Sequence, residues 1–371
     1  MNRLHPCAVI RGTNAAASAT ALRLAAAGYA VLLADTAAFA VARRGPSCDG
    51  TLSDGSVTLD GVACRRVDSA ADWLRYGAHD IALTAQALEQ VLADLSPEVL
   101  VDARMTRHGV ADSPRRLAPL RVELGPGFAA AGNAGLVVET TLDDPPENLS
   151  GHSPAREPVG APQPARIAAA VVDALRRRLG LLPLARAAIA GVLRNAEAGE
   201  LPLFAATLGF DRLEFNALVE TLQPGARLSM PDLGEGYALC AVQEPELFDP
   251  LARMLWEQRA PDLSERRARW LAHAVAAASF GHRHLWQDLG LAGRAETTAL
   301  LDLHFPALAA RNTADLKWKR YLFLALGERL GLDDLQPPGC AGCDSHSSCY
   351  GAARPIPSGL PSGHRRPARP A

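Results

Sequence analysis

Hydrophobic residues follow one spacing in the first part of the chain and another in the second. Before residue 143, short apolar runs at residues 7–10 and 29–34 enclose a turn and an Ala- and Leu-rich helical pattern at residues 15–27. Strand, turn, helix and strand form the opening unit of a nucleotide-binding sheet. Later segments show the same alternation of strand and helix patterns, with a helical pattern at residues 84–95 and apolar runs at residues 99–103 and 136–139. We therefore predict an α/β fold here, a Rossmann-like domain built on a parallel sheet.

Between residues 165 and 331, apolar positions recur every three or four residues, which is the spacing of one face of an α-helix. The pattern occupies residues 167–179, 184–196, 213–222, 247–258, 264–280, 295–303 and 315–330. Glycine and proline fall at or near the ends of these segments, where helices terminate. The second half is therefore predicted to be an all-α domain, so that the whole chain is α/β plus all-α.

A stretch rich in proline and glycine separates the two patterns. Residues 143–163 contain five prolines and hardly any large apolar side chain, which predicts a partly stiff linker. The predicted organisation is a Rossmann-like domain at 1–142, a linker at 143–164, a helical domain at 165–351 that ends in a cysteine loop, and a disordered tail at 352–371. Because few contacts should cross such a linker, a fragment that starts near Ala165 is expected to fold alone.

Composition and charge narrow the class of protein. The 371 residues carry a formal charge of −2, so electrostatics give no reason to expect nucleic-acid binding. No uncharged apolar run reaches about 18 residues, and the N-terminus lacks the pattern of a secretory signal. Four of the seven cysteines are scattered, unlike the disulfide framework of a secreted protein. These features predict a cytoplasmic protein that does not bind a membrane.

The other three cysteines form a C-x2-C-x5-C cluster directly after the last helical pattern. Cys340, Cys343 and Cys349 lie within ten residues, in a segment that also holds proline and glycine. Thiolates are soft ligands, and a loop that brings three of them together selects zinc, Cu(I) or iron-sulfur rather than magnesium or calcium. A structural zinc site would need a fourth ligand. The spacing alone leaves zinc, an iron-sulfur cluster and a disulfide with a spare thiol all open.

A weaker candidate site lies in the first half. Gly12 opens a turn that resembles the glycine fingerprint of dinucleotide-binding sheets, although Asn14 and Ala17 stand where glycine would allow close approach of a pyrophosphate. Asp35, after the second strand, is placed to bond a ribose hydroxyl. Both residues also fit an ordinary turn and an ordinary surface acid. Other candidates for this edge of the sheet are residues 125–128, Asp102 and Glu139.

Two polar segments interrupt the helical half. Residues 282–288 concentrate two imidazoles, an indole and a carboxylate, and residues 317–321 interleave basic and aromatic side chains. The ordinary interpretation of the first is a core Trp286 with polar residues at the surface. That of the second is an amphipathic helix with aromatic residues inside and basic residues in solvent. The functional interpretation is that fixed positive charge stabilises an anionic thiolate cluster or a bound oxyanion such as molybdate.

Together these segments resemble the NifQ family of nitrogen-fixation proteins. The resemblance is carried by residues 284–291, 304–306, Asn312, 317–320, 338–343 and 349–351. It implies an iron-sulfur protein that carries molybdenum as a Mo-Fe-S cluster to biosynthesis of the nitrogenase iron-molybdenum cofactor. Its implied partners are a molybdate source and the cofactor assembly proteins, namely the scaffold and the iron protein. The resemblance implies a metallocluster donor, not an enzyme.

One family cysteine is missing here. The family motif is C-x4-C-x2-C-x5-C, which places its first cysteine at Leu335 of this chain. Three thiolates suit a cuboidal three-iron cluster, with one thiolate per iron and an open corner for molybdenum. We therefore expect a 3Fe-4S type cluster on Cys340, Cys343 and Cys349. Side chains that could complete the site are His346, Asp344 and Cys240.

The first half resembles the YqeB proteins of molybdenum hydroxylase systems, which are relatives of the XdhC maturation factors. The matching residues are 9–12, 21–24, Gly28, 101–105, 124–128 and 138–140. The resemblance implies a fusion of two molybdenum-handling modules, the first with an uncertain nucleotide ligand at Gly12 and Asp35. Two other functions stay open. They are a nucleotide-dependent maturation factor for a molybdenum hydroxylase and a zinc-stabilised helical interaction module.

Overall fold

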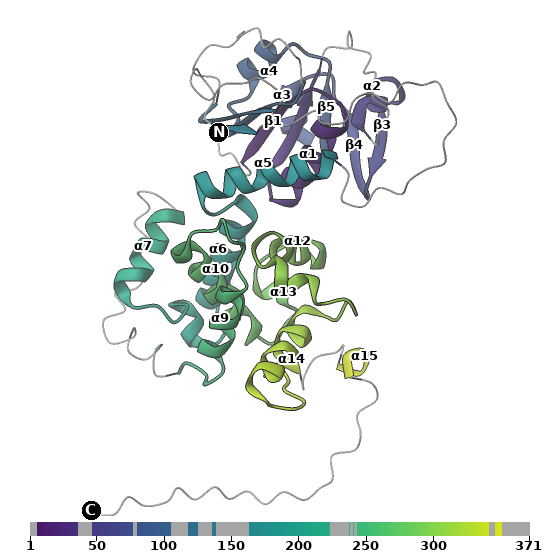
Figure 1. Ribbon diagram of the computed structural model, residues 1–371. Coiled ribbons are helices and arrows are strands. Elements are labelled where there is room, and N and C mark those ends of the chain that lie inside the picture. The colour runs from purple at the N-terminus through teal and green to yellow at the C-terminus, as the bar shows by residue number, and fades with distance from the viewer. Residues whose placement is uncertain are drawn as a thin grey trace, which may run out of the picture.

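The two halves of the chain have the two predicted architectures. The computed structural model describes residues 6–35, 47–76, 80–104, 118–124, 136–138, 163–222, 237, 240, 243–340 and 346–350. A sheet with helices on its faces forms the first half, and helices alone form the second (Figure 1). The α/β plus all-α prediction is therefore confirmed. The predicted linker, apart from its last two residues, and the predicted tail lie outside the described residues.

The sheet has eight strands in the order β3-β4-β5-β2-β1-β6-β7-β8. All neighbours pair in parallel except β3 and β4, which are antiparallel. The strands are β1 (Cys7–Arg11), β2 (Ala30–Ala34), β3 (Ser56–Leu59), β4 (Val62–Arg66), β5 (Ile81–Thr84), β6 (Val99–Asp102), β7 (Leu120–Leu124) and β8 (Leu136–Val138). The sequence pattern located β1, β2, β6 and β8. It missed β5 and β7, and also the exposed pair β3 and β4, which lacks a continuous apolar run.

Helices cover both faces of the sheet, which explains its almost uninterrupted apolar strands. One face packs against α1 (Ala15–Ala26) and α5 (Gln163–Leu179), and the other packs against α3 (Ala70–Tyr76) and α4 (Leu88–Asp94). Successive residues of a strand alternate between the two faces: Ala8 and Ile10 belong to the first core, and Val9 to the second. The result is a doubly wound domain of three layers.

The second half surrounds a separate core. Its helices are α6 (Pro183–Glu197), α7 (Arg212–Leu222), α9 (Phe248–Glu257), α10 (Glu265–Ser279), α11 (Leu285–Asp288), α12 (Arg294–His304), α13 (Pro306–Ala310), α14 (Trp318–Leu330) and α15 (His346–Tyr350), with short 3-10 helices at Cys48–Gly50 in the first half and at Leu203–Ala206. Each helical pattern predicted after residue 183 overlaps one of them. Alanines occupy much of α10, so α6 and α9 pack closely against it.

Helix α5 lies on the sheet, not in the helical core. From its sequence it was predicted to open the helical domain at residue 165, yet it begins at Gln163 and packs along α1 (Figure 1). Its apolar residues Ile167, Val171 and Leu175 are buried in the core of the sheet domain. Apolar spacing shows that a helix has one buried face, but it carries no information about which surface covers that face. A fragment that starts at Ala165 would therefore expose it.

Two contacts hold the helical half to the sheet domain. The guanidinium of Arg176 in α5 is nearly buried, donates to both oxygens of Asp262 at 2.7 and 2.8 Å, and bonds the carbonyl oxygen of Leu303. At the start of α6, the backbone N–H of Leu184 donates to the carbonyl oxygen of Ala27 at 3.0 Å. We expected few contacts between the segments before and after the linker. That expectation is wrong, because α5 and the start of α6 both pack on the sheet domain.

The described helices include no single one that is long and apolar enough to cross a membrane. Helices α5 and α6 meet that criterion only when they are taken together, across a bend of 53°.

Substitution of Gly28 tests the contact between the halves. Gly28 has φ +90°, and a Cβ there would lie 2.7 Å from the Leu184 backbone nitrogen. Gly28→Ala should lower the free energy of unfolding by about 2–4 kcal/mol, because left-handed strain adds to overpacking. Gly61 is the matched control, with φ +80° and no atom near its Cβ position. Gly61→Ala should cost only about 1 kcal/mol. Equal losses in urea denaturation would argue against a tight junction.

A buried histidine predicts acid sensitivity. His304 ends α12, is completely buried, and neither ring nitrogen has a hydrogen-bond partner among the described residues. Burial lowers its pKa from 6.5 to about 3, and Arg176 adds to this shift. As pH falls below about 6.5, the unfolded chain takes up a proton that the folded chain rejects, so stability declines. The loss should reach about 2 kcal/mol at pH 5 relative to pH 8.

His304→Leu removes this group while keeping an apolar side chain in the core. Its stability at pH 8 should be close to that of the parent, because the imidazole makes no hydrogen bond that would be lost. At pH 5 the variant should be the more stable of the two. Denaturation curves at both pH values measure the difference, and parallel pH profiles would refute the assignment.

Candidate metal centre

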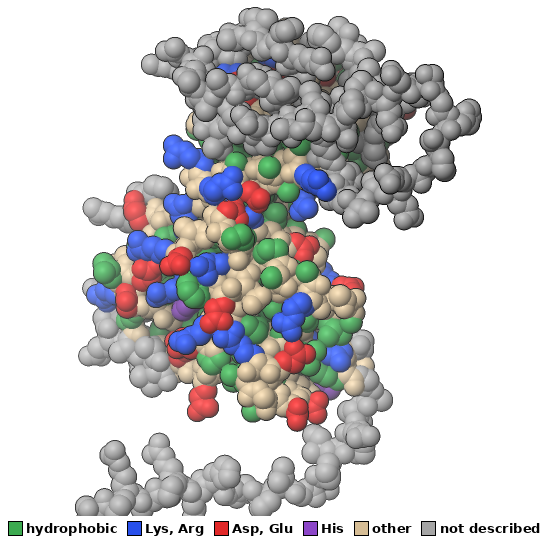
Figure 2. All heavy atoms as spheres, in the orientation of Figure 1, with side chains coloured by type: hydrophobic (Ala, Val, Ile, Leu, Met, Phe, Trp, Pro, Cys, Tyr) green, Lys and Arg blue, Asp and Glu red, His purple; other side chains and the backbone are tan. Residues whose placement is uncertain are grey.

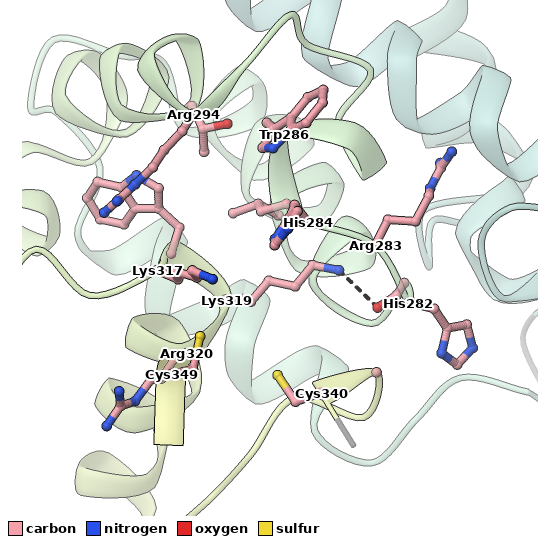
Figure 3. Close-up of a pocket in the computed structure, with 15 residues that line it drawn as sticks. His282, Arg283, His284, Trp286, Arg294, Lys317, Lys319, Arg320, Cys340 and Cys349 are labelled. Carbon is pink, nitrogen blue, oxygen red and sulfur yellow. Dashed lines mark hydrogen bonds between the residues drawn. The ribbon is translucent and has the colours of Figure 1, made fainter. Parts of the chain in front are cut away.

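The cysteine segment closes one side of a cavity of about 230 Å³ in the helical half. Five stretches form its wall: the turn that leads into α11 with the start of that helix, the first turn of α12, the first turn of α14, the segment around Cys340, and α15. The described lining residues are Gly281, His282, Arg283, His284, Leu285, Trp286, Arg294, Thr297, Lys317, Trp318, Lys319, Arg320, Gly339, Cys340 and Cys349. In Figure 3 the two cysteines lie at one end and Trp286 and Arg294 at the other.

A buried carboxylate fixes the floor of this cavity. Asp288 is completely buried and forms ion pairs with Lys319 at 2.5 Å and with Arg283 at 3.0 Å. The Lys319 ammonium also donates to the carbonyl oxygen of Gly281 at 2.9 Å (Figure 3). Burial lowers the pKa of Lys319, and the Asp288 carboxylate opposes that shift. The ion pairs therefore bind α14 to the turn before α11.

Close backbone packing brings the cysteine segment to the same turn. A Cβ on Gly339 would lie 2.6 Å from the Gly281 carbonyl oxygen and 2.8 Å from the His282 Cα. Only glycine allows the two backbone segments to approach this closely. Cys340 follows directly and is thereby held at the cavity wall.

The two described cysteines of the cluster both line the cavity. Cys340 and Cys349 are half-buried, and the Tyr350 hydroxyl donates to the Cys340 Sγ at 3.9 Å. The Arg320 guanidinium lies 4.7 Å from the centre of the Tyr350 ring. Burial raises the pKa of Tyr350, and the nearby Cys340 adds to that shift. Helix α15 thus places Cys349 and Tyr350 beside Cys340 and the start of α14.

Positive charge dominates the wall of the cavity. Among the described lining residues, five are Lys or Arg, two are His and none is Asp or Glu. Elsewhere on the helical half, the face shown in Figure 2 mixes blue and red side chains. A concave, partly apolar surface with charge of one sign attracts anions. The arrangement therefore favours negative ligands over positive ones.

The structure reverses part of the ordinary interpretation of the two polar segments. Trp286, predicted to be core, is only half-buried at the cavity wall, whereas Asp288, predicted to be a surface acid, is completely buried. Trp318 and Tyr321 are buried as expected, but so is Lys319. Lys317 and Arg320 line the cavity and are not simply solvent-facing. Sequence reasoning placed Gly339 in the cysteine loop, but it did not identify Arg294 or Thr297 as parts of the site.

The remaining predicted ligands have different outcomes. Cys343 and Asp344 lie outside the described residues. Within the described residues, the cavity included, no three His, Cys, Asp or Glu side chains are grouped so that they could hold a metal ion. His346 stacks on Tyr350, and the buried Cys240 is not among the lining residues. Leu335, at the position of the missing cysteine, packs against the helical core.

The first half places the predicted nucleotide residues near one another. The Thr13 hydroxyl, next to Gly12, donates to Asp35 at 3.2 Å, and burial raises the pKa of Asp35. Asn14, where the fingerprint expects glycine, caps α1 by accepting from the Ala17 N–H and donates to the Ala103 carbonyl at 2.6 Å. Asn14 thus ties the start of α1 to the end of β6, where a pyrophosphate would have to approach. Nucleotide binding stays a prediction.

The other candidates at this edge of the sheet divide into described and undescribed residues. Asp102 forms ion pairs with Arg104 at 2.8 Å and Arg11 at 3.6 Å. Residues 125–128 and Glu139 lie outside the described residues.

Comparison with known proteins yields two separate similarities. A family model described as NifQ matches residues 188–351. The chain is 36% identical over 152 residues to Protein NifQ of Azotobacter vinelandii, which covers 39% of this chain and 77% of that protein. It is 31% identical over 158 residues to Protein NifQ of Rhodobacter capsulatus, which covers 43% of this chain and 83% of that protein.

The second similarity is to a protein from Escherichia coli named Uncharacterized protein YqeB. Identity is 31% over 137 residues, which make up 37% of this chain and a quarter (25%) of the relative. No solved structure matches the chain.

Substitution of Gly339 tests how the cysteine segment is held. Gly339→Ala would force its Cβ against the Gly281 carbonyl and should push Cys340 away from the cavity. We expect alkylation of Cys340 by iodoacetamide to become several-fold faster, while the denaturation midpoint changes little. The matched control is Gly293→Ala, because nothing lies within 4 Å of that Cβ position. If both variants react at the parent rate, as followed by peptide mass spectrometry, the close packing does not position Cys340.

Proposed function

The chain belongs to the NifQ family, and from this premise we propose that it is a molybdenum carrier, not an enzyme, in nitrogen fixation. The family has a role in nitrogen fixation and molybdenum handling. The proposed cargo is a Mo-Fe-S cluster, and the proposed destination is the assembly of the nitrogenase iron-molybdenum cofactor. The scaffold and the iron protein of that assembly are the proposed partners.

One observation carries the proposal. Cys340 and Cys349, nine positions apart, line one cavity whose described wall holds five cationic side chains and no carboxylate. Cys343 lies between them in the sequence. Thiolates are soft ligands that suit iron and molybdenum, and a thiolate-bound cluster is usually anionic. Fixed cations at the wall would lower the electrostatic cost of holding it. The donors and the charge therefore fit the proposed cargo.

Three thiolates favour the cuboidal form of the cluster. Each cysteine would bind one iron, which leaves the fourth corner open for molybdenum. Leu335, at the position of the missing family cysteine, packs against the helical core instead of offering a ligand. Other residues of this chain would position the cysteines and supply charge. Gly339 holds Cys340 at the wall, and Lys319 and Arg283 contribute positive charge at the floor.

The N-terminal half is proposed to be an accessory module of this carrier. Its similarity to YqeB reaches only a quarter of that relative, so a shared activity does not follow from it. Asn14 occupies the turn where a bound pyrophosphate would approach the backbone. That contact disfavours the alternative of a nucleotide-dependent maturation factor.

Metal analysis of the protein tests the carrier proposal. Protein purified without oxygen should contain iron, acid-labile sulfide and molybdenum, and should absorb in the visible range. Cys343→Ser should bleach it and reduce bound iron and molybdenum severalfold, because a serine oxygen is a harder and poorer ligand. Cys240→Ala is the matched control, since Cys240 is buried and does not line the cavity. It should retain all three elements. Zinc without sulfide, or an unchanged Cys343→Ser protein, would contradict the proposal.

A further inference from the structure

The cations around the cavity differ in how far carboxylates already neutralise them. Arg283 and Lys319 share the single buried charge of Asp288, and Arg283 also pairs with Glu200 at 3.5 Å. Arg294 pairs with the exposed Asp315 at 2.5 Å. Arg320 lies over the Tyr350 ring and has no carboxylate partner in the part of the chain that the structure describes. The wall therefore keeps an excess of positive charge before any cysteine ionises.

The first turn of α14 adds backbone donors at the same place. Lys317 precedes the helix, and its side chain makes no capping hydrogen bond. The Tyr321 N–H donates to the Lys317 carbonyl oxygen at 3.0 Å, which is the first bond of the helix, so the N–H groups before Tyr321 have no helical acceptor. The positive end of the helix dipole points the same way. Residues 317–320 all line the cavity, so an anion inside it would meet this helix end.

A buried hydroxyl on the opposite helix independently indicates a missing ligand. Thr297 in α12 lines the cavity, is only 1% exposed, and its hydroxyl has no hydrogen-bond partner in the described structure. A buried polar group without a partner carries a desolvation cost. The neighbouring Thr298 differs in this respect, because its hydroxyl accepts from the Trp318 indole at 2.9 Å. Thr297 is thus a spare donor at the wall.

The size and lining of the cavity restrict which ligands could accept hydrogen bonds from these donors. A volume of about 230 Å³ holds an ion of five heavy atoms together with several waters, because one water occupies roughly 30 Å³. Trp286 and Trp318 supply apolar walls, which exclude water and strengthen charge interactions. Donors come from two helices, α12 and α14. Such an arrangement suits a compact anion with oxygens in several directions.

From these features we propose that the cavity binds a tetrahedral dianionic oxyanion of the molybdate class, held by Arg320, Lys317, the first turn of α14 and Thr297, next to the cysteines. The assignment of molybdate rests on the proposed function, whereas the oxyanion geometry rests on the cavity. The oxyanion site does not require a cluster. Uncombined molybdenum would therefore be held within the cavity that presents Cys340 and Cys349.

A cluster-free chain provides the test. In the full-length variant with Cys340, Cys343 and Cys349 all changed to Ser, equilibrium dialysis should still show one molybdate bound per chain. Binding should weaken as salt rises, because the contacts are ionic. Tungstate, which has the same charge and shape, should compete, and sulfate and phosphate should compete much less. Sulfate that displaced molybdate at equal concentration would overturn the assignment to the molybdate class.

Substitutions in the same background locate the site. Arg320→Gln should weaken molybdate binding by about tenfold or more, which is the usual effect of losing one charge-assisted hydrogen bond. Arg329→Gln is the matched control on the same helix, because Arg329 pairs with Glu257 outside the cavity. It should bind like the parent. Thr297→Val should weaken binding severalfold without lowering the melting temperature, since its hydroxyl makes no bond in the ligand-free chain.

Two outcomes would overturn the inference. One is a folded triple-Ser chain that binds no molybdate, and the other is binding that Arg320→Gln and Thr297→Val both leave unchanged. Failure of the proposed function gives a different result. In that case the parent protein would contain no iron or sulfide, while the triple-Ser chain would still bind molybdate.

Discussion

The buried Asp288 carboxylate is the interaction on which the candidate site depends. It has no exposure to solvent and holds two cations, Lys319 from α14 and Arg283 from the turn before α11. The amide of Asn195 in α6 donates to the backbone carbonyls of Gln287 and Asp288, which anchors α11 to the helical core. Burying the charges of Asp288 and Lys319 is costly unless they are paired and hydrogen-bonded, so this arrangement tolerates few alternatives. Its main effect is to specify one relative placement of α6, α11 and α14.

That placement gives the cavity its charge. With Lys319 directed to the floor, the next residue along α14, Arg320, reaches the wall, and so does Lys317 before the helix. Gly339 then allows the cysteine segment to pack directly on the turn that the ion pairs hold. Thiols, cations and apolar rings thus share one enclosure, although they come from stretches more than fifty residues apart. A soft donor set in a positive, partly dry environment favours an anionic cluster or an oxyanion over a hydrated cation.

The two halves are joined more closely than two domains on a tether would be. Helix α5 completes the cover of the sheet, and its Arg176 reaches across to Asp262 and Leu303 in the helical half. Buried contacts of this kind restrict relative motion of the two cores. His304 lies buried near the same guanidinium, so the acid sensitivity predicted from its lowered pKa arises at this junction.

The sequence by itself determined the two fold classes, half of the strands, most of the described helices, the family, and the importance of the cysteine segment. Apolar spacing and turn residues reflect local structure, and they correctly predicted β1, β2, α10 and α14. The sequence could not show that α5 covers the sheet, because a helical stripe looks the same whichever surface buries it. It also could not show that Asp288 is buried or that Lys319, alone of its basic neighbours, points inward. Those outcomes depend on partners distant in the chain, and only tertiary packing decided them.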